Sequence, residues 1–320
     1  MRKVGVLLLN MGGPDSLEAV QPFLYNLFSD HDIIAIPRLI QKPVAWIISH
    51  VRAKKTMTYY RYMGGKSPQK EQTLEQAQKL QEVLGDGFLV KVGMRYWHPF
   101  IEEALQEMES YPLSGLILLP MYPQYSRTTT GSSFNEFDRV FPKSQMSFLP
   151  VVKIQHYYDH PLYIQAMVEN IKENLPNWQD YFFLFSAHSL PISVIKKGDP
   201  YQFQTERTVQ LIMQHFPGVN YALAYQSKVG PVKWLQPETE KVLEDVIKRG
   251  VKKVAVIPVS FVNEHSETLY ELDYQYGNMA RSLGVEDYVR IPTLRTHPTF
   301  VRCLADLVLS HALQHQLIGN

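Results

Sequence analysis

The chain has 320 residues, of which 45% are hydrophobic and 20% are charged, a composition typical of globular proteins. This length suggests two domains, or one large α/β unit. A formal charge of +1 leaves no strong basic field, so nucleic acid is not expected as a partner. The single cysteine, Cys303, excludes within one chain an intramolecular disulfide framework, a CxxC redox pair and an all-cysteine metal site.

The N-terminus begins with Met1-Arg2-Lys3 and a short apolar run, Val4–Leu9, which a glycine-containing loop follows. We interpret this run as a buried first strand, because it is too short for a signal peptide and no small-residue cleavage site follows it. No run of about 18 uncharged apolar residues occurs, so no transmembrane helix is expected and we predict a cytoplasmic protein.

Short apolar runs alternate with helical patterns along the chain, which is typical of parallel sheets covered by helices. The runs that predict strands are Val4–Leu9, Phe88–Val92, Gly115–Leu119, Tyr181–Phe185, Tyr221–Ala224 and Val254–Val259. The patterns that predict helices are Gln72–Leu84, Ile101–Met108, Pro161–Leu175, Tyr201–Phe216 and Glu238–Lys248.

A weak internal repeat relates the two halves, because strand and loop patterns of the first half recur in the same order in the second. We therefore predict an α/β protein with two similar Rossmann-like domains, each a parallel sheet flanked by helices, and an active-site cleft between them. The predicted boundaries are 1–155 for the first domain, 156–290 for the second, and 291–320 for a C-terminal helix that packs back on the first.

The first half also carries an insertion at about 31–63, in which Pro37, Arg38, Lys42 and Pro43 interrupt the apolar segment Ile33–Ile48. The segment is too short and too interrupted to span a membrane. One interpretation is an apolar lip over a binding cleft, which would contact the inner face of the membrane peripherally. The other is a helical hairpin packed on its own domain.

A histidine, His188, follows the predicted strand Tyr181–Phe185. Side chains just past the carboxyl ends of parallel strands lie where α/β folds bind ligands. An imidazole there can bind a divalent metal or transfer a proton near neutral pH. The alternative is a loop histidine that is hydrogen-bonded to backbone.

A second polar cluster, with Glu264, His265, Glu267 and Glu271, follows the predicted strand Val254–Val259. Glu267 and Glu271 are four residues apart and share a helix face, where like charges are mildly destabilising unless a cation or a proton path uses them. A solvated helix start would explain Glu271 alone. Together, at the mirror position of the His188 loop, Glu264, His265 and Glu267 favour a functional role.

Aromatic and small residues fill the loops after other predicted strands. Such loops, at one edge of the sheets, suit a large, flat, conjugated ligand that carries carboxylates. The alternative is that some of these aromatic side chains fill the core. The loops are Arg95–Pro99, Met121–Ser133 and Gln226–Leu235.

The chain resembles the ferrochelatase family in blocks spread over nearly its whole length. The longest block runs from Leu184 to Tyr201, and the others are Leu8–Pro14, Tyr122–Ser126, Gln226–Pro231 and Glu267–Asp273. The resemblance implies two Rossmann-like domains and a lyase. That enzyme would insert Fe²⁺ into protoporphyrin IX and release two protons, in the last step of heme biosynthesis.

The resemblance also implies roles for individual residues. His188 and Glu267 match the catalytic pair at the metal. From the chemistry of insertion we further expect Glu264, His265 and Glu271 to relay protons or to support that pair. The positions that match residues around the porphyrin are Met11, Arg52, Tyr60, Ser67, Tyr122 and Trp234.

Four features distinguish this chain from some members of that family. Short members that use the more carboxylated coproporphyrin lack the lip and carry tyrosine where Met11 stands, so protoporphyrin IX is expected here. Arg127 occupies the place of the central cysteine in members that hold an iron–sulfur cluster, and the chain ends at Asn320 without the extension that carries the others. We therefore expect no iron–sulfur cluster and no permanently bound cofactor, with Fe²⁺ as a substrate.

Other functions stay open. A chelatase for coproporphyrin or another tetrapyrrole would suit a more cationic cleft. A non-catalytic porphyrin or heme carrier would need an axial ligand and an apolar pocket, but no paired His and Glu on different loops. A serine hydrolase that uses Ser186 and His188 is disfavoured, because residues two apart in one loop rarely form a nucleophile–base pair.

Overall fold

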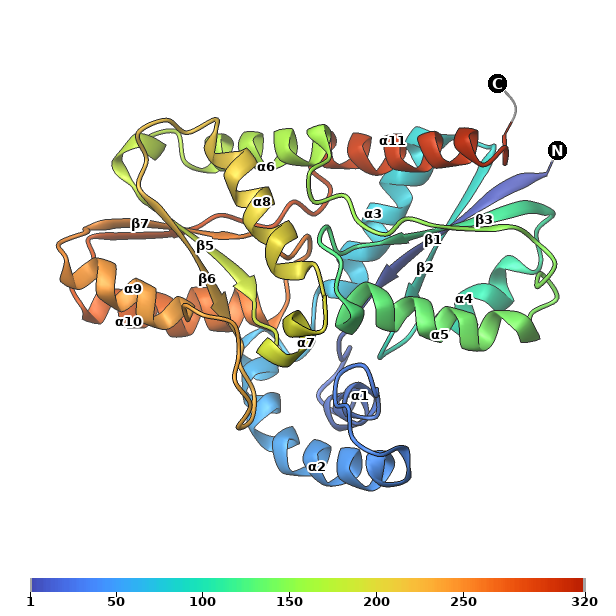
Figure 1. Ribbon diagram of the computed structural model, residues 1–320, viewed down its shortest axis with the longest axis horizontal. Helices are drawn as coiled ribbons and strands as arrows, with labels where there is room; N and C mark the ends of the chain where they lie inside the picture. Colours follow the sequence, from blue (N-terminus) through green and yellow to red (C-terminus); the bar gives the residue numbers. More distant parts are fainter. Residues whose placement is uncertain (1, 319–320) are drawn as a thin grey trace. The chain divides into compact units, whose positions relative to one another are not determined.

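The computed structural model describes residues 2–318, which form two compact units. The first unit contains residues 2–156 and 301–318, and the second contains residues 157–300. Each unit is built around one four-stranded parallel sheet with helices on its faces (Figure 1). The predicted α/β class with two similar domains is confirmed.

The first sheet has the strand order β2-β1-β3-β4, and every neighbouring pair is parallel. Its central strand is buried almost throughout, as expected of a parallel strand covered on both faces. The strands are β1 (Lys3–Asn10), β2 (Phe88–Met94), β3 (Leu113–Pro120) and β4 (Val151–Lys153).

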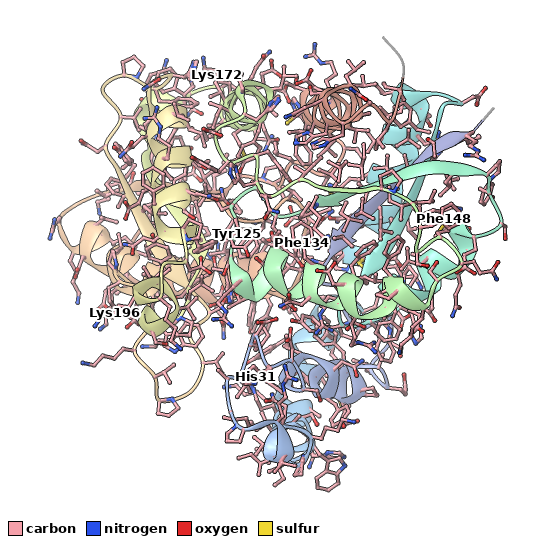
Figure 2. All side chains as sticks on the ribbon, turned by 45° about the vertical axis from the view of Figure 1, so that its right-hand side comes forward. His31, Tyr125, Phe134, Phe148, Lys172 and Lys196 are labelled. Atoms are coloured by element: carbon pink, nitrogen blue, oxygen red, sulfur yellow. The ribbon has the colours of Figure 1, made fainter. Side chains whose placement is uncertain are left out.

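Helices cover both faces of this sheet. Leu7 and Leu9 of β1 belong to one core with α4 (Ile101–Met108) and α5 (Ser132–Val140). On the other face, the Asn10 side chain donates a 3.0 Å hydrogen bond to Thr73 of α3 (Gln69–Leu84). Figure 2 labels Phe134 of α5, which is part of this core, and Phe148, which is 80% exposed.

The insertion of the first unit forms one long helix, α2 (Arg38–Tyr62), which makes a helical hairpin with the preceding helix α1 (Val20–Phe28). One stripe of α2, including Ala45 and Tyr60, packs against α1. The two prolines leave α2 continuous, because Pro37 precedes the helix and Pro43 lies near its start, where it removes one helical hydrogen bond. Among the described residues, no helix is long and apolar enough to cross a membrane.

The second sheet has the order β6-β5-β7-β8, again parallel throughout. The two sheets have the same strand order, in which β5, β6, β7 and β8 take the places of β1, β2, β3 and β4. The predicted repeat is therefore present in the topology. The strands are β5 (Phe182–His188), β6 (Tyr221–Gln226), β7 (Lys253–Pro258) and β8 (Asp287–Arg290).

Two sets of helices cover the second sheet (Figure 1). The helices α6 (Pro161–Asn174) and α8 (Tyr201–Met213) lie on one side. The other side packs against α9 (Thr239–Lys248), α10 (Gly277–Ser282) and the π-helix η4 (Glu267–Tyr276). The remaining segments are η1 (Arg127–Gly131), η2 (Phe141–Lys143), η3 (Trp178–Asp180), α7 (Ile192–Lys196) and α11 (Pro298–Gln314).

The short edge strands β4 and β8 were not predicted. They have three and four residues and are only partly buried, so they lack the continuous apolar run that identified the other strands. The single cysteine, Cys303, is fully buried in α11.

Candidate metal and porphyrin site

The backbone of His188 is fixed at the carboxyl end of β5, the central strand of the second sheet. Its N–H donates to the Ser260 hydroxyl at 2.9 Å, and its carbonyl accepts from the Tyr201 hydroxyl at 2.8 Å. These contacts come from the segment after β7 and from α8, so two neighbouring elements fix the backbone position from which the imidazole projects.

One carboxylate, that of Glu267, is shared by two imidazoles. The Nδ1 atom of His188 lies 3.0 Å from Oε1 and 3.1 Å from Oε2 of Glu267. The Nε2 atom of His265 lies 3.3 Å from Oε2 of the same carboxylate. Within the described part of the chain, the buried Nδ1 of His265 has no hydrogen-bond partner. The second unit therefore gathers three candidate residues into one cluster.

Glu267 is the first residue of η4, which is a π-helix of ten residues and not the ordinary helix that the sequence predicted. A π-helix is closed by hydrogen bonds between residues i and i+5; it is rare in proteins and is frequently found at functional sites. The spacing of Glu267 and Glu271 is close to one turn in either helix, so the sequence pattern could not distinguish them. Both residues contact Gln226, whose amide donates to the Glu267 carbonyl at 3.0 Å and to the Glu271 carboxylate at 3.3 Å.

His188 and Glu267 each favour the charged form of the other. Burial opposes charge on His188, but the negative charge of Glu267 and the hydrogen bond to it raise the pKa of His188 above its usual value. Burial likewise opposes charge on Glu267, but the two histidines outweigh it and hold the pKa of that carboxyl well below its usual range. Glu267 is therefore a permanent anion near neutral pH.

The pKa of Glu271 is shifted in the direction opposite to that of Glu267. Burial and the nearby charge of Glu267 raise its pKa, although several donors hold the carboxylate. The backbone N–H of Ser227 lies 3.1 Å from Oε1, its hydroxyl 2.5 Å from Oε2, and the Tyr276 hydroxyl 3.1 Å from Oε1. Ser227 adopts a left-handed backbone conformation, with φ of 66°, to present both groups. Two neighbouring carboxyls thus differ in how readily they take up a proton.

Glu264 directs its carboxylate to Arg290 on β8. The Arg290 Nη1 atom lies 2.9 Å from both carboxylate oxygens. Burial raises the pKa of Glu264, but the Arg290 guanidinium outweighs burial and lowers it below the usual value. Glu264 is therefore an ion-paired carboxylate, and its partner Arg290 was not identified from the sequence.

The candidate porphyrin residues fall in both units. In the first, Met11 and Tyr122 follow the carboxyl ends of β1 and β3, and the Arg52 guanidinium lies 5.5 Å from the ring of Phe28. Met11 packs against the hydrophobic cluster that contains Tyr60.

Tyr60 and Ser67 are 5% and 3% exposed, so protein atoms cover most of each side chain. Ser67 donates its backbone N–H to the Pro14 carbonyl at 2.8 Å. In the second unit, the indole N–H of Trp234 donates to the Val229 carbonyl at 3.1 Å, in the loop after β6.

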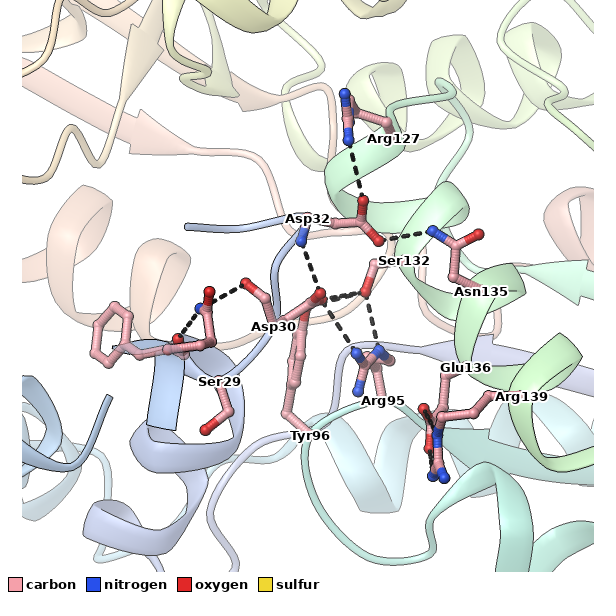
Figure 3. A network of polar contacts seen from close by, with 12 residues as sticks. Ser29, Asp30, Asp32, Arg95, Tyr96, Arg127, Ser132, Asn135, Glu136 and Arg139 are labelled. Carbon is pink, nitrogen blue, oxygen red and sulfur yellow. Dashed lines mark hydrogen bonds and ion pairs between the residues drawn. The ribbon is translucent and has the colours of Figure 1, made fainter. Parts of the chain in front are cut away.

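A buried polar network in the first unit escaped the sequence analysis (Figure 3). The carboxylate of Asp30, 4% exposed, accepts from the Tyr96 hydroxyl at 2.6 Å and from the Ser132 hydroxyl, and pairs with Arg95 at 3.3 Å. It thereby ties the end of the hairpin's first helix to the loop after β2 and to the start of α5. A lone aspartate after a helix gives no spacing signal, so only the fold identifies its partners.

A second group of potential metal ligands lies elsewhere in the second unit. Donor atoms of Glu169, Glu173 and His297 all lie within 4.8 Å of one another. The His297 imidazole accepts the Thr299 N–H at 3.3 Å, and its Nε2 lies 3.2 Å from Glu173. These contacts cap the start of α11, so we assign the group a structural role.

Comparison with known proteins identifies the family. The sequence model described as Ferrochelatase matches residues 3–312. The chain belongs to the ferrochelatase family. A ferrochelatase from Sulfurihydrogenibium sp. (strain YO3AOP1) is 63% identical over 331 residues, covering 97% of this chain and 99% of the relative. One from Aquifex aeolicus (strain VF5) is 60% identical over 306 residues, covering 96% and 98%.

The family resemblance inferred from the sequence is thus confirmed, and with it the activity: a lyase of heme biosynthesis that inserts ferrous iron, as substrate, into a porphyrin. Among solved structures, SirB from Bacillus subtilis with Fe³⁺ aligns with a TM-score of 0.59 at 10% identity, covering 98% of this chain and 97% of that one. At this identity the likeness supports the shared two-domain fold alone.

Proposed function

We propose that this ferrochelatase uses protoporphyrin IX, and that His188 and Glu267 act directly on the metal and on the pyrrole protons. The observation that carries the proposal is the Glu267 carboxylate held between His188 and His265 at the carboxyl edge of the second sheet. Insertion replaces two pyrrole protons by one Fe²⁺ ion, so the site must handle a dication and two protons in turn.

Glu267 suits the ion, because its lowered pKa keeps it negative while Fe²⁺ sheds water. His188 suits the protons in its neutral form, because its raised pKa makes the neutral imidazole a stronger base than that of an ordinary histidine. Each residue supports the other, since the carboxylate orients the imidazole through a hydrogen bond to Nδ1.

Glu271 would accept protons from this pair. Its raised pKa lets it bind a proton at higher pH than Glu267 can, and Gln226 links the two residues. Protons taken at the pair would pass to Glu271 and then to the hydroxyls of Ser227 and Tyr276, which contact its carboxylate. In this scheme Glu264 and His265 hold the geometry of the segment that carries Glu267.

We assign porphyrin-binding roles to Met11, Tyr122 and Trp234 through their apolar surfaces and to Arg52 through its charge, while the buried Tyr60 and Ser67 would support the residues around them. Protoporphyrin IX is favoured because the hairpin exposes large apolar side chains among the charged residues of α2. These apolar side chains include Leu39, Ile40, Trp46, Ile47 and Val51, with exposed fractions of 94%, 48%, 57%, 56% and 75%.

This surface of α2 also supports a peripheral contact of a cytoplasmic enzyme with the inner face of the membrane. We expect the protein to sediment with vesicles of phosphatidylcholine and phosphatidylglycerol, and the double variant Trp46→Ser/Ile47→Ser to lose that binding. Val83→Ser is the matched control, because Val83 is 54% exposed on α3, outside the hairpin. Equal sedimentation of all three proteins would contradict the proposed contact.

We also propose that the enzyme works without an iron–sulfur cluster, because such clusters are normally held by several cysteines and this chain has one. Anaerobically purified protein should lack the visible absorption of a cluster and retain full activity.

The decisive experiment is anaerobic incubation of the enzyme with Fe²⁺ or Zn²⁺ and protoporphyrin IX, followed through the porphyrin absorption bands, and then the same with coproporphyrin III. Faster metallation of protoporphyrin would support the proposed substrate, and preference for coproporphyrin would overturn it. His188→Ala and Glu267→Gln should bind porphyrin and metallate it at least about 100-fold more slowly. Tight binding without turnover by the unmodified protein would instead indicate a carrier.

A further inference from the structure

Arg290, at the end of β8, binds two carboxylates that bracket Glu267 along the chain. Its Nη1 atom lies 2.9 Å from both oxygens of Glu264, three residues before Glu267. Its Nε and Nη2 atoms lie 2.5 and 2.8 Å from the two oxygens of Asp273, inside η4. One guanidinium therefore binds a residue just before the π-helix, Glu264, and the seventh residue of the helix, Asp273.

This arrangement requires arginine specifically. The side chains of Arg290 and Glu264 are each 9% exposed, so both charges are removed from most of the solvent. A guanidinium offers several N–H donors in a rigid plane and can bind two carboxylates at once. The lysine ammonium is a point charge on a flexible stem, and it cannot reproduce both bidentate contacts.

The backbone of Arg290 is held in the parallel sheet, where the residue pairs with Val256 of β7. Tyr288, two residues earlier on the same face of the strand, donates its hydroxyl to the Leu272 carbonyl of η4 at 2.6 Å. Edge strand β8 therefore contacts the π-helix through two side chains, at Leu272 and at Asp273.

We propose that Arg290 is a positioning residue for metal insertion: it holds η4 in its π-helical register, so that the Glu267 carboxylate stays on His188. The proposal rests on the role proposed above for Glu267. A π-helix is intrinsically less favourable than an α-helix, so ten residues in this register need fixed points outside the helix. Arg290 supplies such points before and after Glu267 without contacting the reacting atoms.

The principal test is Arg290→Lys in the full-length enzyme. We expect the KM for Fe²⁺ or Zn²⁺ to rise, or kcat to fall, by about 10- to 100-fold, while the KM for porphyrin stays within about twofold. Arg139→Lys is the matched control, because Arg139 also makes a bidentate contact, with Glu136 at 2.7 and 2.8 Å, but is 57% exposed on α5. Unchanged metal kinetics in folded Arg290→Lys would overturn the proposal.

Two further measurements separate positioning from general stability. Asp273→Asn weakens only the contact of Arg290 with Asp273 and leaves the contact with Glu264. The loss of metallation rate should therefore be smaller than in Arg290→Lys, and the double variant should be no slower than Arg290→Lys. In Arg290→Ala, methylguanidinium in the assay should restore metallation in a saturable way, which a merely destabilised protein would not show. Strict additivity together with absence of rescue would also overturn the proposal.

The proposed function can fail separately. If Glu267→Gln and His188→Ala keep full activity, then the role of the pair is wrong. If those variants are inactive while Arg290→Lys is normal, the pair stands and only the positioning role is lost.

Discussion

The two sheets share one strand order, but the side chains at their carboxyl edges differ in chemistry. In the first unit, β1 ends at Asn10 and the π-helical segment after β3 reads Arg-Thr-Thr-Thr-Gly. In the second, the corresponding strand β5 ends at His188, and the π-helix after β7 carries Glu267 and Glu271. The topology fixes where functional side chains can stand, and the sequence at those points decides which chemical groups each edge presents.

The largest expected effect follows from giving the carboxyl edge of the second sheet the residue that stands at the carboxyl edge of the first. His188→Asn places at the end of β5 the residue that ends β1. We expect metallation to slow by at least about 100-fold, because an amide can neither act as a base nor form the charged pair with Glu267. Stopped-flow metallation with Zn²⁺ measures the rate, and fluorescence titration checks that porphyrin still binds. Retained turnover would show that the contrast between the edges is not functional.

The next largest effect concerns stability of the first unit. Asp30→Ala removes the carboxylate from a buried pair and leaves Arg95 without that charge partner, at a cost of about 3–5 kcal/mol in unfolding free energy. Asp32→Ala is the matched control in the same network, because its partner Arg127 is 45% exposed and the pair should contribute less than about 1 kcal/mol. Urea unfolding measures both, and equal losses would contradict the distinction between the two pairs.

A smaller effect should separate porphyrin binding from metal binding. A Cβ atom added at Gly13 would lie 2.6 Å from the Cβ and Oγ atoms of Ser67, so Gly13→Ala must displace that side chain. We expect destabilisation of about 1–3 kcal/mol and a raised KM for porphyrin, with the KM for metal unchanged. Gly87→Ala, which adds a Cβ with nothing within 4 Å, should behave as the unmodified enzyme. A change confined to the metal KM would contradict the porphyrin-supporting role proposed for Ser67.

The smallest effect is on the pH dependence of stability in the metal-free protein. The pKa of His188 is raised from 6.5, so its contribution is fully present below 6.5 and is lost as pH rises through the folded-state pKa. The pKa of Glu267 is lowered from 4.5, so its contribution is present above 4.5 and is lost as pH falls. The Tm difference between unmodified protein and His188→Asn, measured with EDTA, should therefore be greatest between these values and decline at alkaline pH. It should correspond to less than about 1 kcal/mol, because the imidazole is 33% exposed and partly screened.

The features that the sequence could predict are those whose signal lies within a short stretch of the chain. Six strands were predicted from continuous apolar runs, and His188 and Glu267 from their places after two of them. Asp30 and Arg290 carry no such signal: each is a single charged residue whose partners are distant in sequence and meet it only in the fold. The π-helical register of η4 was also invisible, because the same residue spacing fits an α-helix.

The burial of Cys303 has a practical consequence for following the enzyme at work. The chain has no other thiol, and this one is fully buried in α11. A cysteine introduced at Leu39, which is 94% exposed, would therefore be the one accessible point for a maleimide dye in otherwise unmodified protein. An environment-sensitive label at that position would report directly, during turnover, whether the outer surface of α2 enters a bilayer.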